Sequence, residues 1–203
     1  MTATTRRAVY AAVPLLVVAA VSLVFVFRAT SQPAKAETQQ AQGITWSAGE
    51  KRAPAIELRA ADGSPFSLAS LRGHRVIVTF VDPHCTTFCP RESIVLDQAI
   101  RALPPAQRPD IVAVSVDPTV QNEQVLVKEA RRFRWAPQWR WAIGSKAQLE
   151  AVWKRYGITV LPTPDDITHT EAAYVLDARG YQRSLLLWPF KATAVSRALA
   201  AAS

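Results

Sequence analysis

The feature that most constrains the fold is a continuous run of apolar, mostly β-branched residues, VIVTFV, at positions 76–81. Such a run is typical of a strand buried on both faces of a sheet. The run IVAVSV at 111–116 repeats the pattern. A helix is predicted after each run, over 90–103 and over about 120–134. This alternation of strand and helix predicts an α/β domain with parallel strands.

Further segments extend this central pattern on both sides. The first of the two predicted helices has an expected apolar stripe of Ile94, Val95, Ile100 and Leu103. Turn residues and alternating apolar residues predict two hairpins, one over 53–68 and one over 172–188. Another strand is expected over 139–143, and helices are expected over 145–157, between a Ser145 cap and Gly157, and over 192–202. With these hairpins, the sheet should be mixed and flanked by helices.

The first 43 residues have a different composition from the rest. Residues 8–27 carry no charge, with Arg6 and Arg7 before them and Arg28 after them. At about 1.5 Å per residue, a helix of this length spans the hydrocarbon of a bilayer. The alternative is a cleaved signal peptide, but its apolar region is ordinarily shorter, and the only small-x-small candidate, at 34–36, lies well beyond the run. An uncleaved anchor is therefore favoured.

This anchor implies an order along the chain. Residues 1–7 are expected in the cytoplasm, because the arginine pair before the anchor should remain there. Residues 8–27 form the transmembrane anchor, and residues 28–43 form a flexible polar tether. The domain at 44–203 then lies on the extracytoplasmic side, periplasmic or outer, of a single-pass cell-membrane protein.

The charge of the chain does not indicate nucleic-acid binding. The net charge of +8 comes from 24 basic and 16 acidic residues. The basic residues are scattered, apart from Arg131, Arg132 and Arg134, without a long block or interleaved aromatic residues. A solvated face near an anionic membrane explains such charge better.

Both cysteines of the chain, Cys85 and Cys89, directly follow the first buried run. If a helix begins near Cys85, the two thiols lie one turn apart on one face, where they can share a soft metal ion or form a disulfide. A helix N-terminus also lowers the pKa of a thiol. The spacing is one residue longer than the C-x-x-C pair of thioredoxin. An inert structural disulfide is the alternative, although so short a loop gains little entropy from closure.

Several separated motifs together resemble the SCO/SenC family of copper-binding proteins, which take part in cytochrome c oxidase assembly. They are Cys85-x-x-x-Cys89-Pro90 after a strand, Ser115-Val116-Asp117-Pro118, and His169 followed by Tyr174-Val175-Leu176-Asp177 and Gly180. The resemblance covers about residues 50–180. It implies a thioredoxin-like fold, copper ligands at Cys85, Cys89 and His169, and a copper-accepting oxidase subunit as partner. The copper donor is left unidentified.

The sequence also departs from the family pattern. Thr86 stands in place of an expected proline, Asp82-Pro83 in place of an aromatic residue and a threonine, and Thr170 in place of a serine. The stretch 119–123 lacks the usual Asp-Thr-Pro. These changes leave the three ligands in place, but the partner surface of the family does not carry over with them. Asp82 is predicted either to tune the thiols or to cap the following helix.

Two thiolates and one imidazole form a soft ligand set that suits Cu(I) and also accepts Cu(II). The only methionine is Met1, so a thioether site in the domain is excluded. A structural zinc site would need a fourth ligand, for which only His84 or a carboxylate is available. His84 neighbours Cys85, and its side chain is expected to point away from the shared face. The copper hypothesis therefore requires His169 to lie beside the Cys85–Cys89 turn.

The leading functional hypothesis is a metallochaperone rather than an enzyme. The alternative is a thiol-disulfide reductase that uses Cys85 and Cys89 as a redox pair on an oxidase subunit or another exported protein. A peroxidase is disfavoured, because Asp82 occupies the position of the threonine expected three residues before a peroxidatic cysteine. An anchored module with an inert disulfide is the remaining alternative.

Overall fold

The computed structural model describes residues 43–163 and 166–203. Its centre is a seven-stranded sheet in the order β1-β11-β10-β5-β6-β7, with β2 paired to β11. The strands of this sheet are β1 (Gly43–Thr45), β2 (Lys51–Arg52), β5 (Val76–Val81), β6 (Asp110–Ser115), β7 (Trp139–Ala142), β10 (Ala172–Leu176) and β11 (Tyr181–Leu187).

The sheet is mixed, as predicted. Strands β5, β6 and β7 are parallel, and the register places Val81 opposite Ser115. Strand β10 is antiparallel to β5 and forms a hairpin with β11. The carboxyl ends of β5 and β6 therefore meet at one edge of the sheet, and the cysteine segment begins at this edge.

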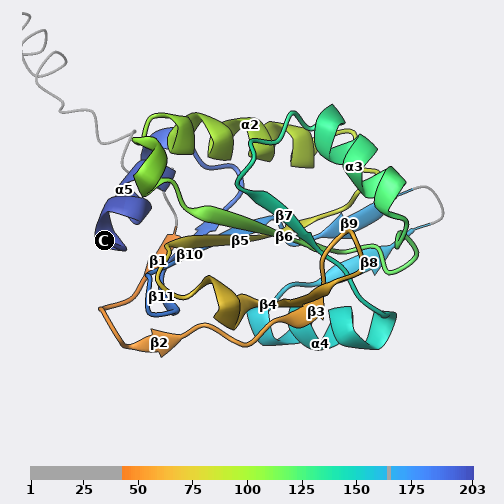
Figure 1. Ribbon diagram of the computed structural model, residues 1–203, viewed down its shortest axis with the longest axis horizontal. Helices are drawn as coiled ribbons and strands as arrows, with labels where there is room; N and C mark the ends of the chain where they lie inside the picture. The colour runs from red at the N-terminus through yellow and green to blue at the C-terminus, as the bar shows by residue number, and fades with distance from the viewer. Residues whose placement is uncertain (1–42, 164–165) are drawn as a thin grey trace, which may run out of the picture. The chain divides into compact units, whose positions relative to one another are not determined.

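Helices cover both faces of the sheet. Side chains of α2 (Phe88–Arg101), α3 (Glu123–Arg132) and α5 (Ala192–Ala201) share one buried cluster with alternate residues of the strands. Side chains of α4 (Lys146–Tyr156) share the other cluster with the hairpin of β3 (Glu57–Arg59) and β4 (Pro65–Ser67). Figure 1 shows α2 and α3 on one side of the sheet and α4 on the other. Two short 3-10 helices complete these layers, Leu68–Leu71 and Pro105–Gln107.

Both ends of α4 lie where the capping residues of the sequence predicted them. Ser145 caps α4 in a capping box with Gln148, and Gly157 ends the helix with φ of 68°. This left-handed conformation suits glycine, which has no Cβ to clash. Both predicted hairpins are present.

Three expectations need correction. The helix expected over 120–134 is shorter, because the Asn122 side chain accepts a hydrogen bond from the Val125 amide and starts α3 at Glu123. Ile94 in the expected apolar stripe is 58% exposed, whereas Ile100 is buried as expected, together with Leu96 and Ala99, which the stripe did not include. The helix expected over 90–103 begins two residues earlier, at Phe88, and ends at Arg101, so Cys85 lies before it.

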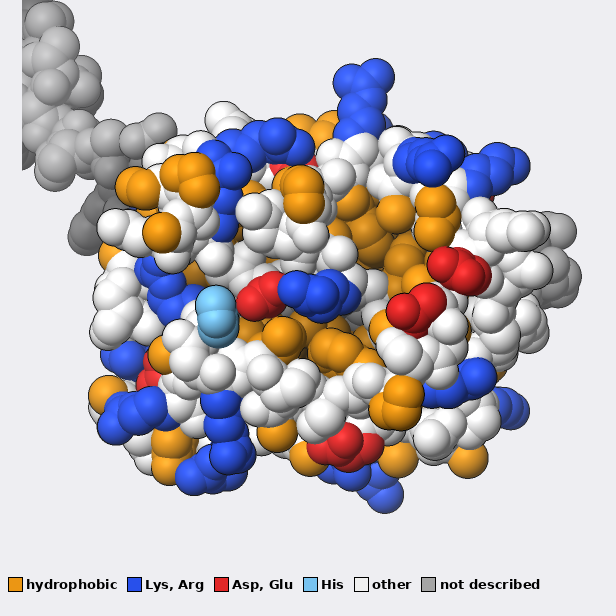
Figure 2. Space-filling model, viewed as in Figure 1, with side chains coloured by type: hydrophobic (Ala, Val, Ile, Leu, Met, Phe, Trp, Pro, Cys, Tyr) orange, Lys and Arg blue, Asp and Glu red, His pale blue; other side chains and the backbone are white. Residues whose placement is uncertain are grey.

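The predicted cytoplasmic segment 1–7, the anchor 8–27 and nearly all of the tether 28–43 lie outside the described residues. Within 43–163 and 166–203, no helix has both the length and the apolar character needed to cross a membrane. Lys and Arg side chains are scattered around the face shown in Figure 2 and do not form one patch there. This distribution agrees with the one expected from the sequence.

Candidate metal centre

The cysteine segment connects β5 to α2. Asp82 is buried, and its Oδ1 accepts a hydrogen bond of 2.9 Å from the His84 amide. The Cys85 amide donates to the Asp82 carbonyl over 3.1 Å. These bonds form a tight turn that ends with Cys89 in the first turn of α2. Asp82 does not cap α2, because the cap residue is Thr87, whose side chain makes no capping bond. The capping alternative is therefore wrong, and the tuning of the thiols by Asp82 stays a prediction.

The two thiols lie close together and are free. The Cys89 amide donates a hydrogen bond of 3.3 Å to Cys85 Sγ. The Cys85 Sγ also lies 3.8 Å from Thr87 Oγ1. Backbone and side-chain donors at the start of a helix stabilise a thiolate, as the sequence had indicated.

The environment gives the two thiols opposite acidities. The Cys89 side chain, followed by the Cys89 and Thr87 amides, lowers the pKa of Cys85 to about 5 against the opposing effect of burial. The pKa of Cys89 is raised, first by its hydrogen bond to Cys85 and then by burial. At neutral pH Cys85 is therefore the thiolate, and Cys89 keeps its proton.

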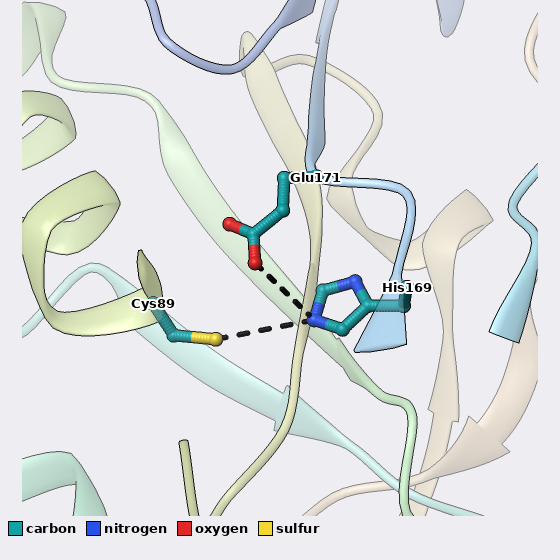
Figure 3. Close-up of side chains that lie close together, drawn as sticks. All are labelled: Cys89, His169 and Glu171. Carbon is teal, nitrogen blue, oxygen red and sulfur yellow. Dashed lines mark hydrogen bonds and ion pairs between the residues drawn. The ribbon is translucent and has the colours of Figure 1, made fainter. Parts of the chain in front are cut away.

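His169 ends the short strand β9 (Ile167–His169), which pairs with β8 (Val160–Pro162). The His169 Nε2 lies 4.0 Å from Cys89 Sγ, although the two residues are 80 positions apart (Figure 3). The structure therefore meets the requirement that His169 lie beside the cysteine turn.

The two ring nitrogens of His169 have different surroundings, which fixes the position of the ring proton. Its Nδ1 lies 3.1 Å from the Thr170 carbonyl oxygen. Because a carbonyl only accepts, Nδ1 carries the proton, and Nε2 keeps its lone pair on the side of Cys89. The side chain is 1% exposed, and burial lowers the pKa of His169. The imidazole is thus held neutral, in the form that binds a metal ion.

Cys85 and His169 both line a cavity of about 400 Å³ between the cysteine turn, β9 and the end of β11. Its other lining residues include Phe88, Ile167 and Trp188. His84 is exposed and does not line this cavity, as the sequence predicted.

Glu171 was not among the residues that the sequence predicted for the site. A carboxylate oxygen of Glu171 lies 3.7 Å from His169 Nε2. Among the described residues, the ligand atoms of Cys89, His169 and Glu171 all lie within 4.8 Å of one another, and Cys85 is not part of this tight group. The available signal was the spacing of two between His169 and Glu171, which places side chains on one side of an extended chain.

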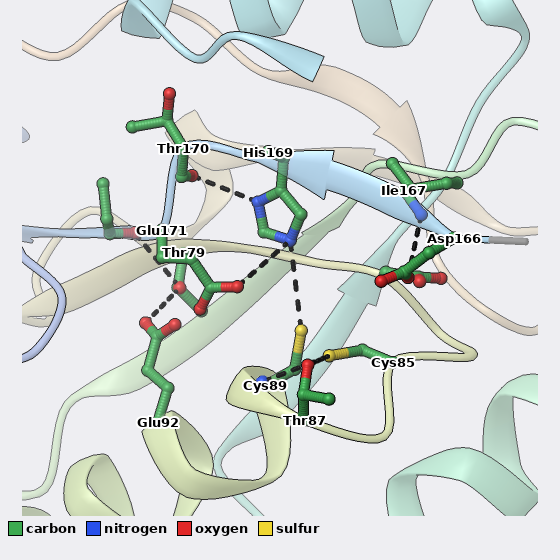
Figure 4. Close-up of polar contacts among 12 residues, drawn as sticks. Thr79, Cys85, Thr87, Cys89, Glu92, Asp166, Ile167, His169, Thr170 and Glu171 are labelled. Carbon is green, nitrogen blue, oxygen red and sulfur yellow. Dashed lines mark hydrogen bonds and ion pairs between the residues drawn. The ribbon is translucent and has the colours of Figure 1, made fainter. Parts of the chain in front are cut away.

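A second carboxyl group, that of Glu92 on α2, lies near Glu171 and Thr79 (Figure 4). Glu92 is 2% exposed and lies one helical turn after Cys89. Its Oε1 lies 2.6 Å from the Thr79 hydroxyl, whose oxygen is also 3.1 Å from the Ala172 carbonyl. Burial raises the pKa of both Glu92 and Glu171, and at Glu171 the charge of Glu92 adds to the increase.

Arg132 on α3 fixes the cysteine turn from outside. Its guanidinium donates to the carbonyls of Pro83 over 3.1 Å and of Cys85 over 2.9 Å, and it pairs with the buried Glu129. Arg132 belongs to the one basic cluster noted in the sequence. It therefore has a structural role through these contacts. Its neighbour Arg131 is also exposed, but its side chain makes no hydrogen bond or ion pair among the described residues.

Replacing Arg132 with glutamine should lower the free energy of unfolding by about 1–3 kcal/mol, because charge-assisted bonds are lost and Glu129 is left buried without its partner. Urea denaturation followed by tryptophan fluorescence measures this change. Arg131→Gln is the matched control and should stay within about 0.5 kcal/mol, as exposed substitutions ordinarily do. Equal effects of the two substitutions would show that the contacts of Arg132 do not stabilise the turn.

Comparison with known proteins identifies the family. The sequence model of the SCO1/SenC family matches residues 47–201, which is most of the chain. The chain belongs to the SCO1/SenC family. No curated protein sequence gives a significant match to it.

Solved structures resemble this SCO1/SenC domain in fold. Arabidopsis thaliana ScoI, described with copper bound, is 21% identical with a TM-score of 0.67, covering 73% of this chain and 96% of its own. BsSco is described as a member of the Sco family of cytochrome c oxidase assembly proteins with a disulfide switch. It is 20% identical with a TM-score of 0.62, over 75% and 93% of the two chains.

A thioredoxin domain of a Bacteroides vulgatus thiol-disulfide oxidoreductase is 19% identical with a TM-score of 0.56, covering 77% of this chain and 96% of its own. Together with the family match, this similarity confirms the predicted thioredoxin-like fold. The SCO1/SenC chain therefore has the architecture expected from its strand and helix order.

Proposed function

We propose that this chain is a membrane-anchored, extracytoplasmic copper carrier that assists assembly of the copper centre of a terminal oxidase. Copper is its cargo, and Cys85, Cys89 and His169 are its ligands. In this proposal residues 1–7 remain in the cytoplasm, residues 8–27 anchor the chain, residues 28–43 form the tether and residues 44–203 carry the copper.

The observation that carries the proposal is the 4.0 Å separation between His169 Nε2 and Cys89 Sγ. No local sequence relation brings these atoms together, so their proximity depends on the fold. Both groups are in a state that suits a metal ion: the thiols are free, and Nε2 has an available lone pair. Two sulfurs and one imidazole nitrogen make a soft donor set that fits Cu(I) and accepts Cu(II).

The acceptor is proposed from the family and from the surface around the site. BsSco is described as belonging to a family of cytochrome c oxidase assembly proteins. Large apolar side chains near the cavity are exposed, with Phe88 at 48% and Leu187 at 46%. Exposed apolar side chains around a polar site are typical of a protein interface. An oxidase subunit docking there would meet the ligands directly.

Titration of the reduced full chain in detergent with Cu(I) should show about one equivalent bound, because one set of three soft ligands is present. Addition of Cu(II) should produce a thiolate-to-copper charge-transfer band. A sample whose two thiols have been alkylated is the control and should bind neither ion at this site. Unaltered binding after alkylation would contradict the ligand assignment.

A second candidate function is reduction of disulfides in an oxidase subunit or another exported protein. The low pKa of Cys85, about 5, favours it, because the thiolate is the attacking form. Cys89 lies one turn away and is placed to resolve a mixed disulfide. The same pair of residues can serve both functions.

A further inference from the structure

The carboxylate of Glu171 forms the third corner of a compact ligand group (Figure 3). Its Oε1 lies 3.7 Å from His169 Nε2, which in turn lies 4.0 Å from Cys89 Sγ. The three side chains come from three places: the first turn of α2, the end of β9 and the link between β9 and β10. A single ion placed among them would meet one sulfur, one nitrogen and one oxygen.

The backbone holds Glu171 firmly in this position. The Thr170 amide before it donates to the Thr159 carbonyl over 2.9 Å, and the Glu171 carbonyl accepts from the Trp188 amide over 3.1 Å. Ala172 after it begins β10 and is completely buried. The carboxylate therefore lies beside the imidazole because the chain is fixed on both sides.

The Glu171 side chain is also mostly enclosed, at 15% exposure. Its Oε2 is buried and has no hydrogen-bond donor among the described residues. A buried carboxylate oxygen without a donor is costly to maintain. Coordination of a cation by this carboxylate would offset that cost.

We propose that Glu171 supplies an oxygen ligand to a divalent ion held by Cys89 and His169, which strengthens the retention of Cu(II) relative to Cu(I). The inference rests on the proposed copper function and adds a ligand to it. A carboxylate is a hard donor that favours divalent ions, whereas Cu(I) prefers the sulfur and nitrogen donors. Glu171 thus shifts the relative affinity of the site toward the divalent oxidation state of the cargo.

The test compares divalent and monovalent affinities of the full chain in detergent, kept reduced and free of oxygen. Co²⁺ serves as a divalent probe because it does not oxidise thiols, and its absorption reports thiolate coordination. Glu171→Gln keeps the size of the side chain and should weaken Co²⁺ and Cu(II) binding on the order of 10–100-fold. Cu(I) affinity, measured against a competing chelator, should change by less than about threefold because its ligands are softer.

Glu92→Gln is the matched control, because it removes a carboxyl group from the same buried pair without removing a ligand. It should leave the Cu(II) electron paramagnetic resonance spectrum unchanged, whereas Glu171→Gln should change it. Equal weakening of Co²⁺ by the two variants would overturn the inference, since the effect would then come from charge alone. Full Co²⁺ affinity in Glu171→Gln would overturn it as well, while normal Cu(I) binding would leave the copper function standing. A wild-type chain that binds neither copper ion would overturn both proposals.

Discussion

Replacing His169 with alanine should weaken copper retention by at least about 100-fold, because even changes outside the ligand shell of a metal site commonly cost 10–100-fold. The same change should leave thiol-disulfide exchange within about threefold, because Cys85 owes its low pKa to Cys89 and Thr87 and not to the imidazole. Chelator competition measures the first quantity, and reduction of a small disulfide measures the second. This variant therefore separates the two candidate functions.

His84→Ala is the matched control for this experiment. His84 directly precedes Cys85, yet its side chain is exposed and lies outside the cavity. It should retain copper as the wild-type chain does. Strong loss of copper in His84→Ala, with full retention in His169→Ala, would contradict the assignment of the third ligand.

The secondary structure of the domain could be predicted because its signals are local. The buried runs at 76–81 and 111–116 are strands, and Ser145 and Gly157 mark the ends of a helix through their own hydrogen bonds and backbone conformation. Ile94 was placed wrongly because an apolar residue on a surface helix does not reveal which face it occupies. That decision depends on the packing of α2 against β5 and α5.

The site was only half visible in the sequence. The spacing of Cys85 and Cys89 indicates a metal or redox site, but His169 was expected there only through family resemblance. Its place depends on the β8–β9 hairpin, which brings β9 to the cysteine turn. For Glu171 the only signal was its spacing of two from His169, and Glu92 had none, because an isolated glutamate is ordinarily exposed. Their burial and their approach to each other follow from tertiary structure alone.

Because Cys85 is the thiolate and Cys89 keeps its proton, substitutions of the two cysteines should have unequal effects on thiol-disulfide exchange. Cys85→Ser should abolish mixed-disulfide formation with a small disulfide, because the attacking thiolate is gone. Cys89→Ser should accumulate the mixed disulfide, because the resolving thiol is gone. Mass spectrometry of the quenched reaction measures both adducts. Both variants should lose most Cu(I) affinity, since each removes one of two sulfur ligands.

The pH dependence provides an independent check on which thiol attacks. Because the pKa of Cys85 is lowered to about 5, alkylation of Cys85 should be nearly constant above about pH 6 and should decline as the pH falls through 5. In Cys89→Ala the side-chain donor that contributes most to that lowered pKa is removed, so the decline should move to higher pH. A profile centred near pH 8–9 in the wild-type chain, as for an ordinary cysteine, would contradict the arrangement of the thiols. If Cys89 were alkylated faster than Cys85, the attacking thiol would be the one beside His169. Cys89 would then be the attacking residue and Cys85 the resolving residue.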